Sequence, residues 1–214
     1  MNTIIRKNVF NPDAFILIGG RSSRLGTDKA FVELGGETLA ERSIAIIRSG
    51  LPSTERISMV AGSSTQFAIE AITADIPCIF DLHEGRGPLG GVHAALSYAN
   101  TAWVFVLACD YPFVLPELIQ LLAENVSDEF DAIVPEQEDG RLQPLCAFYN
   151  VVAAQPIVEE ILKRSRMPPP MHEIVAQLNP RTLKFSEYAH LTGSDTLFIN
   201  INTAEDLERA RGIV

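Results

Sequence analysis

The sequence predicts an α/β fold in which a mostly parallel sheet carries helices on both faces. Short runs rich in β-branched and aromatic residues alternate with helix-length amphipathic segments, as in strands joined by crossover helices. The run at residues 102–108, AWVFVLA, is apolar throughout, which indicates a central strand covered on both faces. We expect one domain, residues 1–214, in which residues 1–13 form an N-terminal extension whose order the sequence leaves open.

Strands are expected where a short apolar run is bounded by turn residues. These runs occupy residues 14–18, 56–61, 77–80, 102–108, 131–136, 144–150, 182–188 and 197–201. The last of them, LFINI, leads into Asn202. Because side chains alternate along a strand, Asn200 and Asn202 are expected on the same face.

Helices are expected between these strands, where apolar residues recur with helical spacing. They occupy residues 37–50, 64–72, 87–99, 115–126, 151–164 and 203–212, and residues 167–178 begin with a proline run. Pro116 lies near the first turn of its helix, where proline is tolerated. Pro156 is expected to interrupt the helix over 151–164, whereas Thr203 and Asp206 predict a capped start for the final helix.

Composition excludes several classes of function. The formal net charge of −10 and the pI near 4.8 argue against a nucleic-acid or anionic-membrane binder, because both need a broad basic face. The longest apolar run is too short to span a bilayer, and the first 13 residues do not resemble a signal peptide. The three cysteines lie far apart and lack zinc-site spacing, so we expect reduced thiols in a soluble, cytoplasmic protein.

A glycine-rich, basic loop follows the first predicted strand, in the stretch FILIGGRSSRLGTDKAF at residues 15–31. Glycines let backbone N–H groups approach a phosphate, and Arg21, Arg24 and Lys29 supply neutralising charge. The loop is neither a Walker A motif nor a dinucleotide fingerprint, because Lys29 comes three residues after Gly26 with no Ser or Thr following. A phosphate site and a solvated surface turn both remain open on local chemistry alone.

Polar residues also follow other predicted strands, at the edge where open α/β sheets bind ligands. Asp110 suits a magnesium ion held by one carboxylate and substrate phosphates, and the alternative is a turn cap. Asp81 precedes the glycine-rich helix entry at residues 87–91, which either offers main-chain groups to a ligand or only satisfies a turn. Asn200 and Asn202 either bind a ligand head group or tie a strand end to a loop.

The order of these features resembles the molybdenum cofactor guanylyltransferases. The stretch LIGGRSSRLGTDKA is similar to the family pattern L-A-G-G-x-S-x-R-M-G-x-D-K-A, and QPLCAFY resembles its Q-P-L-x-A-x-Y stretch. The resemblance runs from about Phe15 to the final helix. It implies a Rossmann-like three-layer α/β/α nucleotidyltransferase fold with a mostly parallel mixed sheet.

The resemblance also implies roles for individual residues. Arg24, Lys29 and Asp110 would be catalytic, and Asp110 would hold Mg²⁺. Asn200 and Asn202 would lie toward the molybdopterin. The complete set of implied ligand-contacting residues is Leu17, Ile18, Gly19, Gly20, Gly26, Lys29, Asp81, Pro88, Leu89, Gly90, Asp110, Asn200 and Asn202. Ile18 replaces the usual alanine, which narrows the mouth of the loop and leaves a backbone contact possible. The second strand ends in MVAG, where some members have an asparagine near the base, and this departure bears on base recognition.

The implied reaction transfers GMP from GTP to the terminal phosphate of molybdopterin, which carries molybdenum, and releases pyrophosphate. Gly20 and the GPLGG turn favour GTP over CTP by the same resemblance. The implied partners are GTP, the molybdenum cofactor and molybdoenzyme apoproteins or their chaperones, with no nucleic acid and no membrane. The alternatives are a cytidylyltransferase or sugar-phosphate nucleotidyltransferase on the same fold, and a non-catalytic GTP-binding adaptor.

Overall fold

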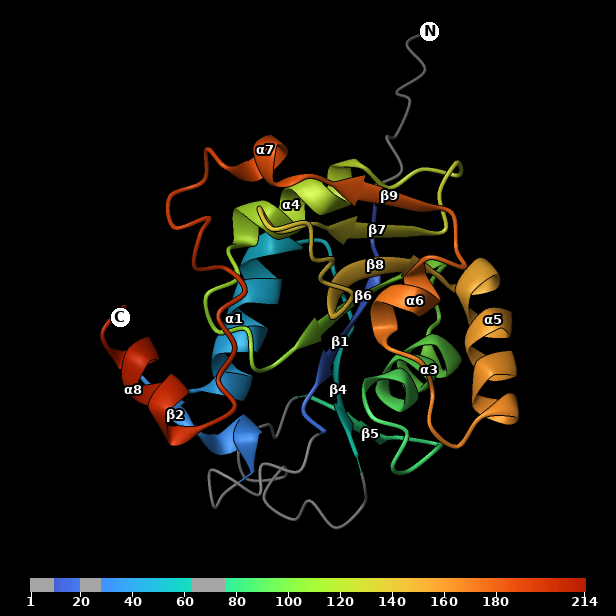
Figure 1. Cartoon of the computed structure of the whole chain (residues 1–214), viewed down its shortest axis with the longest axis horizontal. Helices are drawn as coiled ribbons and strands as arrows, with labels where there is room; N and C mark the ends of the chain where they lie inside the picture. Colours follow the sequence, from blue (N-terminus) through green and yellow to red (C-terminus); the bar gives the residue numbers. More distant parts are fainter. Residues whose placement is uncertain (1–9, 20–27, 63–75) are drawn as a thin grey trace, which may run out of the picture.

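A computed structural model describes residues 10–19, 28–62 and 76–214, and a large mixed sheet lies at its centre (Figure 1). Among these residues seven strands pair in the order β5-β4-β1-β6-β8-β7-β9. Their bounds are β1 Asp13–Leu17, β4 Ile57–Ala61, β5 Cys78–Phe80, β6 Trp103–Ala108, β7 Ala132–Pro135, β8 Cys146–Asn150 and β9 Pro180–Leu183. The short strands β2 (Glu33–Leu34) and β3 (Glu37–Thr38) form a separate hairpin.

Strand β8 is the antiparallel member of the sheet, paired with β6 on one side and β7 on the other. The remaining pairs, from β5 to β6 and between β7 and β9, are parallel. The carboxyl ends of β1, β4, β5 and β6 therefore meet at one edge. The chain order reverses between β1 and β6, which is the position where open α/β sheets form a ligand crevice.

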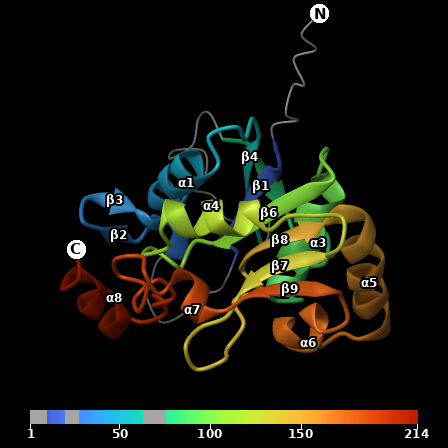
Figure 2. The ribbon, with the colours of Figure 1, turned by 90° about the horizontal axis from the view of Figure 1, so that it is seen from above.

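Helices cover both faces of the sheet, as the alternation of segments predicts (Figures 1 and 2). Helices α1 and α4 pack together on one face, and α3 and α5 pack together on the other. The helices are α1 Leu39–Gly50, α3 Pro88–Tyr98, α4 Pro116–Glu124, α5 Val151–Arg164, α6 Met171–Val175, α7 Phe185–Tyr188 and α8 Ala204–Arg211, with the 3-10 turn η1 at Lys29–Phe31. No helix in the described ranges is both long and apolar enough to cross a membrane.

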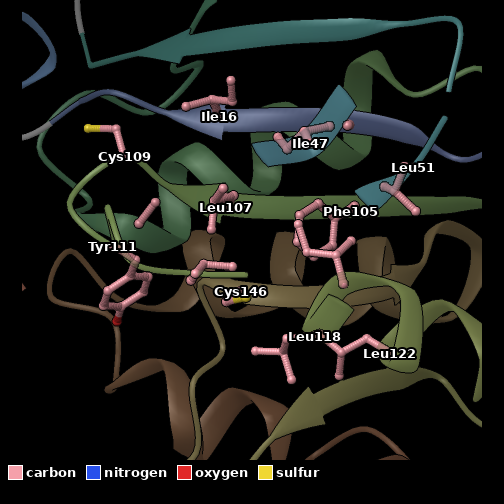
Figure 3. Packing of buried hydrophobic residues seen from close by; sticks show 14 of the residues in the cluster. Ile16, Ile47, Leu51, Phe105, Leu107, Cys109, Tyr111, Leu118, Leu122 and Cys146 are labelled. Atoms are coloured by element: carbon pink, nitrogen blue, oxygen red, sulfur yellow. The ribbon is translucent and has the colours of Figure 1, made fainter. Parts of the chain in front are cut away.

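Alternate residues of β6 build the two hydrophobic cores. Phe105 and Leu107 face α1 and α4, where Figure 3 shows them beside Ile16, Ile47 and Leu118. Val104 and Val106, which alternate with them along the strand, are equally buried and pack toward α3 and α5. Burying one such side chain stabilises the fold by about 1.5–3 kcal/mol. A strand that is apolar on both faces is therefore most stable at the centre of a three-layer fold, where both faces are covered.

A third, smaller cluster joins the two ends of the chain. Val32 and Leu34, which follow the η1 turn, pack with Ile201 and with Ala210 of α8. Ile201 and Leu34 are both fully buried. This cluster holds the segment that contains Asn200 and Asn202 against the segment that contains Lys29.

Most predicted strands are confirmed, and two predictions are wrong. Residues 182–188 are not one strand, because β9 ends at Leu183 and helix α7 begins at Phe185. Residues 197–201 form turns and irregular chain, so Asn200 and Asn202 do not share the face of a strand. Two apolar residues of that run are buried in different places. Leu197 packs in the core beside α1 and α4, and Ile201 packs in the small cluster with Val32 and Leu34. The helix predicted over 64–72 lies outside the described residues.

Helix α5 continues through Pro156, which contradicts the predicted interruption. A proline inside a helix removes the hydrogen bond to the carbonyl four residues earlier, here that of Val152. Val152 is 80% exposed, so water can reach that part of the helix. Ala154 and Val158 on the opposite face are buried against the sheet and hold both halves of the helix in line.

Candidate active site

The carboxyl ends of β1 and β4 approach each other closely at Gly19. The backbone N–H groups of Ile18 and Gly19 both donate to the carbonyl of Val60, at 3.0 and 3.2 Å. A Cβ atom on Gly19 would lie 2.7 Å from the backbone nitrogen of Gly62, closer than real contacts allow. The first glycine of the loop is therefore required by packing between two strand ends, before any ligand is considered.

Lys29 and Asp110 meet at the carboxyl edge of the sheet, beyond the end of β6, where open α/β sheets form their ligand crevice. The Lys29 Nζ donates to Asp110 Oδ2 at 2.8 Å, and their side chains are only 14% and 19% exposed. Lys29 is the first residue of η1, whose N-cap Asp28 accepts a hydrogen bond from the Ala30 N–H. Asp110 lies two residues beyond the end of β6. Two residues that are 81 positions apart thus form one partly buried ion pair.

The C-terminal segment completes this site. Asn202 Oδ1 accepts a second hydrogen bond from Lys29 Nζ, at 2.5 Å, and the Ile201 N–H donates to the backbone carbonyl of Asp110 at 3.2 Å. The N–H groups of Asn202 and Thr203 both donate to Asp206 Oδ2 in the capping box of α8. The helix cap therefore fixes the backbone from which Asn202 reaches Lys29.

Asn200 places an unusual group beside this segment. Its Oδ1 atom is buried and has no hydrogen-bond partner among the described residues. A buried carbonyl oxygen without a partner is costly, so such atoms often mark a position where a ligand donor or a cation binds. Asn200 and Asn202 flank the fully buried Ile201, which anchors both.

Cys109, next to Asp110, is unsuited to act as a nucleophile. The residue is 3% exposed, and burial together with the adjacent Asp110 carboxylate raises the pKa of its thiol far above the ordinary value. Its backbone N–H donates to the carbonyl of Leu17, so the residue serves to join β1 and β6. The sequence-based interpretation of Cys109 as a small buried hydrophobe agrees with this packing.

Asp81 packs against the glycine-rich start of α3. Its carboxylate accepts a hydrogen bond from the His83 N–H at 2.7 Å, and a Cβ atom on Gly90 would lie 2.2 Å from Asp81 Oδ2. Burial raises the pKa of the Asp81 carboxyl, partly opposed by that hydrogen bond. Gly87, just before Pro88, has a φ of +62°, which an L side chain rarely adopts.

Asp81 and Asp110 occupy different parts of the same sheet edge. They follow β5 and β6, which are separated by β4 and β1. Three steps between neighbouring strands correspond to about 14 Å. The edge between the two carboxylates is therefore long enough for an extended ligand and is lined by the backbone of residues 17–19.

Residues 14–180 match the model of the MobA-like NTP transferase domain. The chain belongs to this family. The family resemblance that the glycine-rich loop and the QPL stretch predicted is confirmed, and so is the α/β fold with its mostly parallel mixed sheet. In a MobA-like NTP transferase, the crevice with Lys29 and Asp110 is the candidate nucleotide site.

Relatives with related names cover nearly the whole chain. A molybdenum cofactor guanylyltransferase of Desulfosudis oleivorans is 31% identical over 201 residues, which cover 93% of this chain and 94% of that protein. A probable molybdenum cofactor guanylyltransferase of Pelotomaculum thermopropionicum is 34% identical over 202 residues, which cover 92% and 90%. The crystal structure of molybdopterin-guanine dinucleotide biosynthesis protein A from Archaeoglobus fulgidus matches with a TM-score of 0.75 at 28% identity, covering 94% and 97%.

The structure separates the predicted site residues of this MobA-like chain into groups. Lys29, Asp110 and Asn202 come together in direct contact. Asp81 and Gly90 form a second contact, at the far end of the sheet edge. Leu89, in the first turn of α3, is 1% exposed and its side chain packs in the core. Only its backbone can therefore face a ligand. Three predicted residues, Gly20, Arg24 and Gly26, lie outside the described residues.

Two buried polar residues behind Asp110 were not predicted. The Tyr111 hydroxyl donates to Gln143 Oε1 at 3.0 Å, and both residues are buried. Gln143 begins the QPL stretch, so the resemblance contained a signal for it. Tyr111 carried none, because a tyrosine after a strand is as common in a core as in a site. Their hydrogen bond braces the turn that presents Asp110.

Oxygen donors at the crevice fit a hard cation. Within the described ranges no group of three or more His, Cys, Asp or Glu side chains could hold a metal by itself. Asp110 provides a carboxylate and Asn202 provides an amide oxygen, and both bind the same Lys29 ammonium group. Two positions before Asn202 in the chain, Asn200 Oδ1 is a buried amide oxygen without a partner among the described residues. Mg²⁺ is typically bound by one or two carboxylates together with substrate phosphates, so this donor set suits it.

Proposed function

We propose that this chain transfers GMP from GTP to the terminal phosphate of molybdopterin and releases pyrophosphate. One observation carries the proposal: Lys29 and Asp110 converge within 2.8 Å at the point where the strand order reverses. Membership of the MobA-like NTP transferase family and the names of relatives covering over nine-tenths of the chain support the substrates. A phosphate oxygen of molybdopterin would attack the α-phosphorus, and the bond from that phosphorus to the bridging oxygen would break.

No nucleophile of the protein is needed for this reaction. Lys29 would bind the triphosphate and stabilise negative charge that grows on the α-phosphoryl oxygens and the leaving pyrophosphate. The N–H groups around Gly19 and the loop beyond it would bring the main chain close to the phosphates. Catalysis would then come from alignment of the two substrates and from fixed charges, as in other phosphoryl-transfer sites.

A magnesium ion would be held by Asp110, with Asn200 and Asn202 as neighbouring oxygen donors. Bound there together with the phosphates, it would supply additional positive charge against the transferred phosphoryl group. Tyr111 and Gln143 would keep Asp110 in place through the turn they brace. The hydrogen bond from Lys29 to Asn202 would keep the Lys29 ammonium group close to the Asp110 carboxylate.

The base would lie toward the other end of the sheet edge, near Asp81 and the start of α3. Asp81 is partly buried, and its carboxylate already accepts the His83 N–H, so the same group could accept hydrogen bonds from the N–H groups of a purine. Gly90 allows that carboxylate to approach the helix backbone. Pro88 fixes the first turn of α3 beside it.

The test is a pyrophosphate-release assay with GTP, CTP or UTP and Mg²⁺, in which the acceptor is either molybdopterin or a sugar phosphate, under cytoplasm-like reducing conditions. Lys29→Ala and Asp110→Ala should each lower kcat/KM for GTP by about 100-fold or more, because each removes a fixed charge from the transition state. Lys163→Ala and Asp139→Ala are matched controls on the exposed surface and should leave the rate unchanged.

The outcomes separate the alternatives. Turnover of CTP or UTP with a sugar phosphate, in place of GTP with molybdopterin, would contradict the proposed substrates. Normal rates in both site variants would remove the crevice from the reaction. GTP binding without turnover would indicate a non-catalytic adaptor. If the protein is an active enzyme, we propose that molybdoenzyme apoproteins or their chaperones receive its product.

A further inference from the structure

Lys29 contacts the same oxygens that a divalent cation would use. Its ammonium donates to Asp110 Oδ2 at 2.8 Å and to Asn202 Oδ1 at 2.5 Å. Both acceptors are hard oxygen donors, one charged and one neutral, which is the chemistry that Mg²⁺ prefers. An ammonium and a divalent cation cannot both lie against a single carboxylate oxygen at close range without strong repulsion.

We propose that Lys29 is the resident cation of the Asp110–Asn202 oxygen pair in the ligand-free protein, and that nucleotide phosphates must draw it away before a divalent cation binds. The inference rests on the proposed function, because it takes Asp110 as the metal ligand. It adds an order of events to that function: the cation enters with the nucleotide or after it, and never before it. Asn202 belongs to this resting arrangement in addition to any role toward the molybdopterin.

The surroundings of Lys29 suit such an exchange. Its side chain is 14% exposed, so it is partly buried with Asp110 but keeps some surface that phosphates can reach. It stands at the start of a 3-10 turn of three residues, and its long, flexible stem can swing without moving that turn. A triphosphate offers several negatively charged oxygens in place of one carboxylate and one amide, so the lysine gains contacts when it leaves.

Asn202 is equally well placed to hold the resting state. Its backbone N–H donates to Asp206 Oδ2, and the neighbouring Ile201 N–H donates to the Asp110 carbonyl. The amide oxygen and the carboxylate are thus carried by two segments that are themselves hydrogen-bonded together. The oxygen pair remains assembled when Lys29 leaves, ready for another cation.

The test measures Mn²⁺ binding to the full chain by electron paramagnetic resonance, without nucleotide and then with GTP. Wild type should bind Mn²⁺ weakly alone and tightly with GTP. Lys29→Met, which keeps the stem and removes the charge, should bind Mn²⁺ without nucleotide at least about tenfold more tightly than wild type. Lys29→Gln, which removes the charge and keeps a polar end group, should show the same gain, and Lys163→Met should show none.

Two further variants separate this inference from the proposed function. The Lys29→Met/Asp110→Asn double variant should lose the gain, which assigns the site to Asp110. If neither Lys29 variant gains affinity while Asp110→Asn abolishes Mn²⁺ binding with GTP, the resident-cation inference is wrong and the proposed metal ligand stands. If Asp110→Asn binds Mn²⁺ and GTP as wild type does, the proposed role of Asp110 fails and the inference fails with it.

Discussion

At the scale of single residues, Gly90 is constrained by the carboxylate of Asp81. A Cβ atom at position 90 would lie 2.2 Å from Asp81 Oδ2, so Gly90→Ala must displace either the carboxylate or the start of α3. We expect Gly90→Ala to lower the free energy of unfolding by about 1–3 kcal/mol, as overpacking generally does. Urea denaturation followed by circular dichroism measures this loss.

The double variant tests the cause of that loss. In an Asp81→Ala background the carboxylate is gone, so Gly90→Ala should cost clearly less than it does in wild type. Equal costs in the two backgrounds would show that a contact other than the one with Asp81 selects glycine at this position, because helix propensity by itself favours alanine.

The pKa of Asp81 leads to a prediction about pH. Burial raises this pKa in the folded protein above its unfolded value, so between the two values the folded state binds more protons. Stability contributed by this group therefore falls as pH rises from about 4 through the raised pKa. Asp81→Asn removes the titration and keeps the shape, so its stability relative to wild type should be higher at pH 7 than at pH 4.

Asp139 provides a control of opposite sign. Its pKa is lowered, chiefly by the hydrogen bond from the Arg141 N–H, so its stabilising effect is present above about pH 4 and is lost as pH falls. Urea midpoints of Asp81→Asn and Asp139→Asn at both pH values should change in opposite directions. A change of the same sign in both would contradict the assignment for Asp81.

Asp110 could be predicted from the sequence, and its bracing could not. A carboxylate directly after a long apolar strand must emerge at the sheet edge, so position alone indicates a site residue. The hydrogen bond from Tyr111 to Gln143 joins residues 32 positions apart, on a turn and on the chain before β8. No local pattern contains that pairing, because it depends on β8 lying beside β6.

At the scale of elements, Pro156 makes α5 less stable than it could be. The helix continues through it, so the hydrogen bond to the Val152 carbonyl is missing and the proline ring crowds that turn. Pro156→Ala restores the N–H group on an exposed face and should raise the free energy of unfolding by about 1–3 kcal/mol. Val152→Ala, a change at an exposed residue of the same turn, should alter it little.

Chemical denaturation of the two variants decides this point. Proline also restricts the unfolded chain, which favours the folded state. An unchanged or lower stability for Pro156→Ala would mean that this effect outweighs the missing hydrogen bond to the Val152 carbonyl. The sequence alone predicted an interrupted helix, because the cost of proline is local whereas the packing of Ala154 and Val158 that overrides it is not.

The segment over 197–201 shows the limit of local patterns for strands. Its short apolar run is typical of a strand, yet the backbone forms turns and irregular chain. Strand β6 is already paired with β1 on one side and with β8 on the other, so it has no free edge with which residues 197–201 could pair. Ile201 makes a single backbone hydrogen bond to the Asp110 carbonyl instead, which brings Asn202 to the site by a different route.

At the scale of the whole molecule, a site that begins near the N-terminus depends on the last 15 residues of the chain. A mostly parallel sheet with helices on both faces could be expected from the alternation of segments. The strand order, which puts β6 beside β1, was not predicted. The contact between Lys29 and Asn202, which spans 173 positions, could not be predicted. It requires the cluster of Val32, Leu34 and Ile201, whose members are individually ordinary apolar residues.

Ile201→Ala tests this dependence. Ile201 is fully buried, so its truncation should cost about 2–5 kcal/mol of stability, and it should also loosen Asn202 from Lys29 and the segment from the Asp110 carbonyl. Leu162→Ala in α5 is a matched loss from the core on the opposite face of the sheet. Calorimetric titration with GTP and Mg²⁺, at a temperature where both variants are folded, should show weaker GTP binding for Ile201→Ala alone. Equal GTP affinities would mean that the C-terminal segment stabilises the fold without organising the crevice, because a purely structural loss affects the two variants alike.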